Sequence, residues 1–347
     1  METEEHVDAA DTYDLDMTRT KSLSTLASAL TIITAIAFFS AERTAPPASA
    51  SNPGSGRVGV YLTSHALAIP EVVRGFLEAR EAGKLDALVI NVKNMHGEVT
   101  YATEIPLARR IGAAAERIDF TLLLPELQRR GFYLIARQVV FFDPLLAAHL
   151  GRTEDWIPAD DETATAYNLA IAEEVATFGF DEIQFDYIRF EDDGELLAAY
   201  EERYEAVENF LAEASRRLAG RVALSADLFG RVLWPWNERR IDPIGQSLEG
   251  VCPHVDYVSP MLYPSHYVEE TYQNDPYRVV MDALTGARER VVARFRPFLQ
   301  AFDMRLPTNM ALETYIKEQI RAANDAGADG YLFWHPACDY TALYNVL

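Results

Sequence analysis

The sequence predicts an α/β protein, a (β/α)8 TIM barrel preceded by an N-terminal hydrophobic helix and a disordered linker. Short apolar runs of strand type alternate with longer stretches of helical period, which is typical of parallel strands joined by crossover helices. The chain has 347 residues, of which 49% are hydrophobic, and one such barrel needs roughly 250 residues. One barrel with an N-terminal extension is therefore the simplest division of the chain.

The first part of the extension resembles a targeting segment. Residues 1–22 form a polar leader, and residues 23–41 form an uncharged apolar run that is about long enough to cross a bilayer as a helix. Arg19 and Lys21 lie just before the run, as in a cleaved signal peptide or an uncleaved transmembrane anchor. Met17 is an alternative start. We expect an exported protein, either anchored in the membrane with the barrel outside or secreted.

The linker and the barrel follow. Residues 42–56 are rich in Pro, Ser, Ala and Gly and predict a flexible linker, and residues 57–347 contain the barrel. The strand candidates, in order, are Val58–Thr63, Ala87–Lys93, Tyr133–Val140, Glu182–Tyr187, Val222–Asp227, Tyr257–Tyr263, Pro297–Phe302 and Gly330–Trp334. The helix candidates include Pro70–Ala82, Ala164–Phe178, Glu201–Leu218, Tyr277–Val292 and Thr314–Ala326. Several helix candidates end at a glycine, which readily adopts the left-handed backbone that closes a helix.

The composition argues against several classes of function. The 31 Lys+Arg against 53 Asp+Glu give a formal net charge of -22, which repels polyanions, so no nucleic-acid partner is expected. Cys252 and Cys338 fall on different segments without zinc-site spacing and predict free thiols. His65, His96 and His266 show no HxH or HExxH spacing, so neither a metal nor another cofactor is expected.

Two carboxyl groups at neighbouring strand ends are the predicted catalytic residues. The active site of such barrels lies at the C-terminal ends of the strands, where GFDEIQFDYIRF contains Asp186 and SADLFG contains Asp227. Cleavage of a glycosidic bond needs one ionised carboxylate and one carboxyl group that is kept protonated. We therefore predict Asp186 as nucleophile and Asp227 as acid/base. The alternatives are an Asp186 ion pair with Arg137 or Arg189, and an Asp227 helix cap.

Polar and aromatic residues at the other strand ends are predicted to bind a carbohydrate substrate. In strand four, period two places Gln184 on the same face as Asp186. Aromatic side chains at strand ends serve either as platforms for sugars or as barrel filling, and the cations either contact substrate or neutralise inward carboxylates. The predicted substrate-binding residues are Tyr61, Asn91, Lys93, Arg137, Gln184, Arg189, Tyr263, His266 and Trp334.

Six ordered motifs between Val58 and Trp334 carry a family resemblance. They are INVKNMHGEVTY, LIARQVVFFDPLLA, GFDEIQFDYIRF, SADLFG, GQSLEG and DYVSPMLYPSHY. Together they resemble a glycoside hydrolase domain family of bacteria and archaea that has long been classed as a domain of unknown function. The resemblance implies a glycosidase-type barrel, often on exported or membrane-tethered proteins. The chain departs from the family at Asn94, where an acidic residue is usual, and at Glu191, where proline is usual.

The fourth-strand motif also resembles the DGxDxDxE signature of chitinase-type barrels. Gln184 replaces the middle Asp of that signature, and Ile188 stands where the acid/base Glu belongs, so a chitinase mechanism is not supported. Barrels with a fourth-strand nucleophile and a fifth-strand acid are the closer analogy. We expect an exported glycoside hydrolase that cleaves a poly- or oligosaccharide with retention. The alternative is a catalytically inactive carbohydrate-binding barrel of the cell envelope.

Overall fold

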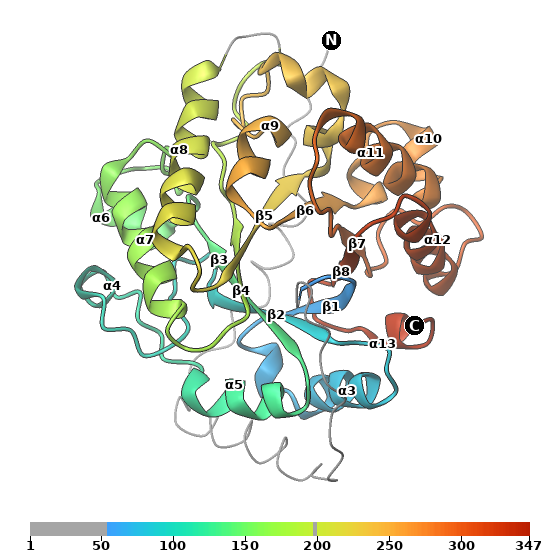
Figure 1. The fold of residues 1–347 in the computed structure, drawn as a ribbon, viewed down its shortest axis with the longest axis horizontal. Helices are drawn as coiled ribbons and strands as arrows, with labels where there is room; N and C mark the ends of the chain where they lie inside the picture. The colour runs from blue at the N-terminus through green and yellow to red at the C-terminus, as the bar shows by residue number, and fades with distance from the viewer. Residues whose placement is uncertain (1–53, 197–199) are drawn as a thin grey trace.

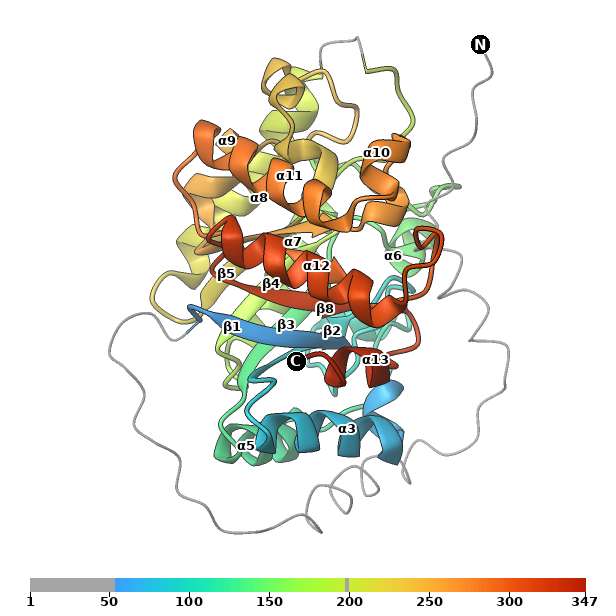
Figure 2. The same cartoon turned by 90° about the vertical axis from the view of Figure 1, so that its right-hand side faces the viewer.

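A computed structural model describes residues 54–196 and 200–347. Eight parallel strands close into a barrel in chain order, and helices surround them (Figure 1), which confirms the predicted fold. The strands are β1 (Arg57–Leu62), β2 (Ala87–Lys93), β3 (Tyr133–Val139), β4 (Glu182–Asp186), β5 (Ala223–Phe229), β6 (Tyr257–Leu262), β7 (Phe298–Gln300) and β8 (Gly330–Trp334). The ring closes where β1 pairs with β8, and helix α13 packs beside α3 near this seam (Figure 2).

The helices follow the predicted amphipathic segments. The α-helices are α3 (Pro70–Glu81), α4 (Pro106–Arg110), α5 (Phe120–Arg129), α6 (Pro144–His149), α7 (Glu162–Val175), α8 (Glu201–Leu218), α9 (Leu248–Val251), α10 (Glu270–Gln273), α11 (Pro276–Arg290), α12 (Leu312–Asp325) and α13 (Thr341–Tyr344). The short 3-10 helices are η2 (Ala66–Ala68), η3 (Gly230–Leu233), η4 (Pro235–Arg239), η5 (Cys252–His254) and η6 (Pro264–His266).

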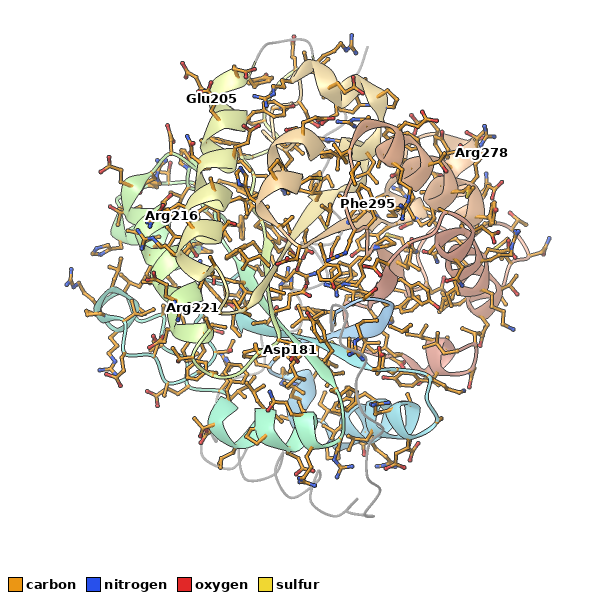
Figure 3. All side chains as sticks on the ribbon, in the orientation of Figure 1. Asp181, Glu205, Arg216, Arg221, Arg278 and Phe295 are labelled. Atoms are coloured by element: carbon orange, nitrogen blue, oxygen red, sulfur yellow. The ribbon has the colours of Figure 1, made fainter. Side chains whose placement is uncertain are left out.

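Helix α8 illustrates how the sequence pattern places these helices. Tyr204, Val207, Leu211 and Leu218 are buried and recur at the spacing of one helical face, whereas Glu205 is exposed. Figure 3 shows charged side chains such as Glu205 and Arg278 projecting outward from the ring of helices, while Phe295 lies inside it. After α3 and α12 the chain turns through Gly83 and Gly327, whose φ values of 73° and 69° are left-handed.

A polar layer fills the floor of the barrel, at the N-terminal ends of the strands. Glu182 is fully buried there, pairs with Arg296, and accepts hydrogen bonds from Tyr133 Oη (3.0 Å) and Ser225 Oγ (2.5 Å). Because every one of these partners is buried, Glu182 carries its charge far from solvent but fully hydrogen-bonded. The inward-facing carboxylate of Glu182, below Asp186, is therefore a structural part of the barrel.

The end of the predicted linker belongs to this floor. The Gly54 carbonyl accepts a hydrogen bond from Arg296 Nη1 at 3.4 Å, and the Gly56 amide donates to Asp329 Oδ1 at 3.1 Å. A Cβ atom at Gly54 would lie 2.6 Å from Tyr257 Oη, so only glycine fits. The linker predicted over residues 42–56 therefore does not include its last three residues, which seal the barrel instead.

Several predicted features lie outside the described residues. The leader over residues 1–22, the apolar run over residues 23–41 and the linker up to residue 53 belong to them. Within the part of the chain that the structure describes, no helix combines the length and apolar character needed to span a membrane. Cys252 and Cys338 are not joined in a disulfide, in agreement with the prediction.

Lys93 was predicted to contact substrate, and the structure contradicts this. The pairing of β2 with β3 shifts by one residue between Asn91 and Lys93, so Lys93 turns away from the barrel axis toward α7. Its Nζ lies 2.8 Å from Asp143 Oδ2 and donates to Asn168 Oδ1 at 3.1 Å, with the lysine fully buried. Lys93 therefore stabilises the layer between barrel and helices.

We expect Lys93→Met to destabilise the barrel by about 3–5 kcal/mol, because it leaves the buried Asp143 carboxylate without its cation. The free energy of unfolding in urea measures this effect. The matched control is Lys317→Met, an exposed lysine on α12, which should change the free energy of unfolding by less than about 0.5 kcal/mol. Equal stability of the two variants would contradict the assigned role of Lys93.

Candidate active site

A cavity of about 660 Å³ opens where the C-terminal ends of the strands meet. Tyr61 of β1, Arg137 of β3, Asp186 of β4, Asp227 of β5 and Trp334 of β8 all line it. These residues come from distant parts of the chain and meet because parallel strands of a barrel end on one face. The two predicted catalytic carboxyl groups thus lie in the same cavity.

Asp186 is held rigidly at the end of β4. Its Oδ2 accepts hydrogen bonds from Arg137 Nε (2.9 Å) and Nη2 (2.5 Å), and its Oδ1 accepts one from the Tyr187 amide (2.7 Å). Tyr187 has a left-handed φ of 53°, a strained conformation that is concentrated at functional sites. This turn also brings Tyr187 to the cavity, although period two along the predicted strand Glu182–Tyr187 would place Tyr187 on the face opposite Asp186. The alternation fails there because β4 ends at Asp186.

A hydrogen-bonded chain orients Arg137 from behind. Arg137 Nη1 donates to Asn91 Oδ1 at 2.8 Å, and Asn91 Nδ2 donates to Tyr61 Oη at 2.7 Å. Asn91 is 3% exposed and does not line the cavity, so the predicted contact between Asn91 and substrate is wrong. Asn91 instead fixes the guanidinium plane of Arg137. The ion-pair alternative for Asp186 is also confirmed with Arg137, and the pair borders the cavity.

The surroundings of Asp227 favour its protonated form. The side chain is 1% exposed, and its removal from water, together with the nearby charge of Asp186, raises the pKa of Asp227 well above the usual value. The Oδ1 atom of Asp227 has no hydrogen-bond partner among the described residues. Asp227 lies within β5 and caps no helix of the described chain.

The two carboxyl groups come from neighbouring strands. Phe185 of β4 pairs with Ala226 of β5, so Asp186 and Asp227 follow at the same level of the barrel and line one cavity. Acid and nucleophile are about 5–5.5 Å apart in retaining glycosidases, and roughly 6.5–9.5 Å apart in inverting ones. The distance between the two carboxyl groups therefore bears directly on the stereochemical outcome.

Gln184 and Arg189 were also predicted to contact substrate, and they lie at different depths in the barrel. Gln184 is fully buried below the cavity and donates to Ser259 Oγ at 3.2 Å, so its predicted role in substrate binding is wrong. Arg189 does line the cavity, with its guanidinium 4.1 Å from the Trp156 ring centre and 4.4 Å from that of Phe229. Ile188, at the position of the chitinase acid, is fully buried in the core.

Aromatic rings form one wall of the cavity. The Trp334 ring centre lies 6.4 Å from Tyr61, 5.9 Å from Tyr263 and 5.3 Å from Phe302. Tyr61, Tyr263 and Trp334 all line the cavity, as does His266, in agreement with their predicted positions. Exclusion of water, reinforced by the charge of Arg305, lowers the pKa of His266 to about 4, so the imidazole is neutral near pH 7.

Further aromatic residues at the cavity were not anticipated from the sequence. Trp156, Phe229, Trp234 and Trp236 also line it, and Trp234 stacks on Tyr272 at 5.2 Å. Part of the signal was present in the sequence, because two tryptophans flank Pro235 in the loop after β5. Many rings around one cavity suit the flat apolar faces of sugars.

The charged residues of the cavity do not form a metal centre. Within residues 54–196 and 200–347, no group of three or more His, Cys, Asp or Glu side chains is arranged to hold a metal ion. His65 and His96, which were considered as ligands, do not line the cavity, whereas His266 does. The groups that line the cavity include the two carboxyl groups, Arg137 and the aromatic rings.

Comparisons with solved structures agree with the barrel fold. The glycoside hydrolase domain of PgaB (BpsB) from Bordetella bronchiseptica has a TM-score of 0.60 at 14% identity, covering 84% of this chain and 98% of that one. The spore cortex-lytic enzyme SleL of Bacillus cereus has a TM-score of 0.55 at 14% identity, covering 84% and 73%. An endo-1,4-β-D-mannanase from Thermotoga petrophila has a TM-score of 0.54 at 14% identity, covering 80% and 88%.

Comparison with sequence families identifies the class of enzyme in addition to the fold. No curated protein matches the chain. Residues 59–340, almost the whole barrel, match the family model described as "Putative glycosyl hydrolase domain". The matched range contains every residue named above in the cavity, so the site belongs to the family domain itself. The chain therefore belongs to this glycosyl hydrolase family, and its barrel is a glycosidase domain.

Proposed function

We propose that the protein hydrolyses a poly- or oligosaccharide outside the cytoplasmic membrane, with Asp186 as nucleophile and Asp227 as acid/base. The observation that carries the proposal is the pair of carboxyl groups in one cavity, where burial and the charge of Asp186 raise the pKa of Asp227 and Asp186 pairs with Arg137. One ionised and one protonated carboxyl group are the two states that glycosidic bond cleavage requires.

The roles follow from this arrangement. Asp186 attacks the anomeric carbon while Asp227 transfers its proton to the departing glycosidic oxygen, and a water molecule then releases the sugar with proton return to Asp227. Asp186 and Asp227 lie on neighbouring strands and line the same cavity, so both can reach one glycosidic bond. The Oδ1 of Asp227 has no hydrogen-bond partner among the described residues and is available to the glycosidic oxygen.

The test is the release of reducing ends from a panel of poly- and oligosaccharides by the purified full chain. The proposal expects release from at least one glycan and loss of that release in Asp186→Asn. Equal release by the wild type and by Asp186→Asn would contradict the assignment of Asp186. Release that requires neither Asp186 nor Asp227 would place the reaction elsewhere in the molecule.

A carbohydrate-binding barrel without turnover is the second candidate. The ion pair between Asp186 and Arg137 favours it, because it occupies the carboxylate that would act as nucleophile. In that case a glycan would bind without being cleaved. In both cases we expect Trp334→Ala to weaken binding by about tenfold, because the ring is the centre of one aromatic wall. Isothermal titration calorimetry measures the affinity, and an unchanged affinity would remove Trp334 from the binding surface.

The location outside the membrane rests on the N-terminal segment. Supporting it are the uncharged apolar run over residues 23–41 and the cations Arg19 and Lys21 before it. Export would place the cavity where extracellular polysaccharides can reach it. Protease added to intact cells should then digest the anchored chain, or the secreted chain should accumulate in the medium. A chain that is fully protected inside cells would contradict export.

A further inference from the structure

We propose that Arg305 and His266 form a subsite that binds an anionic group on the substrate, so that the glycan is an acidic one carrying carboxylate, sulfate or phosphate groups. This inference rests on the proposed glycosidase function and specifies its substrate class. Both residues line the cavity on the wall that carries Tyr263 and Trp334. An anion bound there would lie beside the sugar that stacks on those rings.

Arg305 differs from the other arginines of the cavity. Arg137 is paired with Asp186, and Arg231 is paired with Asp192 and Asp242, each at 2.8 Å. Arg305 is exposed and makes no ion pair with any carboxylate of the described residues. Its Nη1 donates to the Ser265 carbonyl at 3.3 Å, and the remaining guanidinium donors are not used by protein carboxylates. In a protein with a net charge of -22, such an arginine in a cavity is a recognition element for an anion.

The two loops that carry the subsite are joined by one buried side chain. Gln300 is fully buried, and its Oε1 accepts from the Ser265 amide at 3.2 Å. Its Nε2 donates to the carbonyls of Phe302 (3.0 Å) and Met304 (3.1 Å), directly before Arg305. The loop after β6 and the loop after β7 are therefore fixed relative to each other before any ligand binds.

The backbone and the neighbouring imidazole agree with a built subsite. Arg305 has a left-handed φ of 48°, a conformation that a non-glycine residue keeps only where its surroundings hold it. His266 Nδ1 is 2.9 Å from Ser265 Oγ. Arg305 also lies close enough to His266 to lower its pKa to about 4, after the larger effect of lost hydration. The pair thus offers a permanent charge beside a neutral hydrogen-bonding ring.

The experiment measures binding in a background without turnover. The full chain carrying Asp186→Asn is titrated calorimetrically with an oligouronate, a sulfated oligosaccharide and a phosphorylated oligosaccharide. Each is compared with its neutral counterpart after carboxyl reduction, desulfation or dephosphorylation. We expect at least one acidic form to bind about tenfold more tightly than its neutral form, as one charge-assisted hydrogen-bonded contact allows.

Variants then assign that preference to the subsite. Arg305→Gln should abolish the preference, and Arg305→Lys should retain part of it because it keeps the charge but loses the planar donors. The matched control is Arg110→Gln at the end of α4, another exposed arginine with the same loss of charge and no place in the cavity. Arg110→Gln should leave the preference unchanged.

The outcomes separate this inference from the proposed function. Equal affinity for acidic and neutral forms, or a preference for the acidic form that survives Arg305→Gln, would overturn the subsite. If the wild type hydrolysed a neutral glycan in that case, the glycosidase proposal would remain intact. Binding of acidic glycans that depends on Arg305, without hydrolysis of any of them by the wild type, would support the subsite and contradict the proposed reaction.

Discussion

Replacement of Asp186 by Asn should lower the turnover of a glycan substrate on the order of 10⁴-fold, because the amide can neither attack the anomeric carbon nor stabilise its positive charge. The amide oxygen can still accept a hydrogen bond from Arg137, so the geometry of the cavity should persist. The measurement is kcat, with circular dichroism and thermal unfolding on the same preparation. Turnover within about tenfold of the wild type would remove Asp186 from the reaction.

A matched control separates chemistry from stability. Glu182 lies four residues earlier on the same strand and the same face, and it also forms a buried pair with an arginine, Arg296. Glu182→Gln should therefore destabilise the fold by a similar mechanism while leaving kcat per folded molecule near the wild-type value. If Glu182→Gln and Asp186→Asn lost activity equally, the activity loss would be structural in both.

Replacement of Asp227 by Asn should affect substrates according to their leaving groups. A sugar leaving group needs a proton, so kcat should fall by about 10²–10⁴-fold, whereas a dinitrophenyl glycoside needs none and should retain most of its rate of bond cleavage. The measurement is the pre-steady-state rate of aglycone release with both kinds of substrate. An equal loss with both would contradict an acid role for Asp227.

The raised pKa of Asp227 gives this prediction a pH dependence. The proton needed for catalysis is present below the pKa of Asp227, so the rate should fall as the pH rises through that pKa. The folded protein also binds this proton more tightly than the unfolded chain does. Stability from this group is therefore present below the ordinary pKa of Asp and is lost as the pH rises through the folded pKa. Asp227→Asn should consequently be at least as stable as the wild type at neutral pH.

The fold was predictable because its signals are local. Each strand is a short apolar run and each long helix has one buried face, so β2 and β8 have the predicted bounds and α8 matches its predicted range. The ends of β7 were less predictable. After Gln300 the strand stops, because the Gln300 side chain, rather than a neighbouring strand, donates to the carbonyls of Phe302 and Met304.

The candidate site was only partly predictable because it depends on relations between strands. A one-residue shift in pairing turned Lys93 away from the axis, and depth along the barrel separated Gln184 from Asp186. Sequence alternation gives the face of a residue but neither its register nor its depth. The position of Asp186 beside Asp227 likewise depends on the register of two paired strands, which no spacing in the chain records.

The most direct test of the account is to trap the glycosyl-enzyme. A dinitrophenyl 2-deoxy-2-fluoroglycoside of the sugar that the protein cleaves has a fast first step and a slow second one, so a covalent intermediate accumulates. Mass spectrometry of the full chain should show one added glycosyl group, and peptide mapping should place it on Asp186. A label on Asp227 or on Glu191, or hydrolysis without any covalent adduct, would contradict Asp186 as the nucleophile.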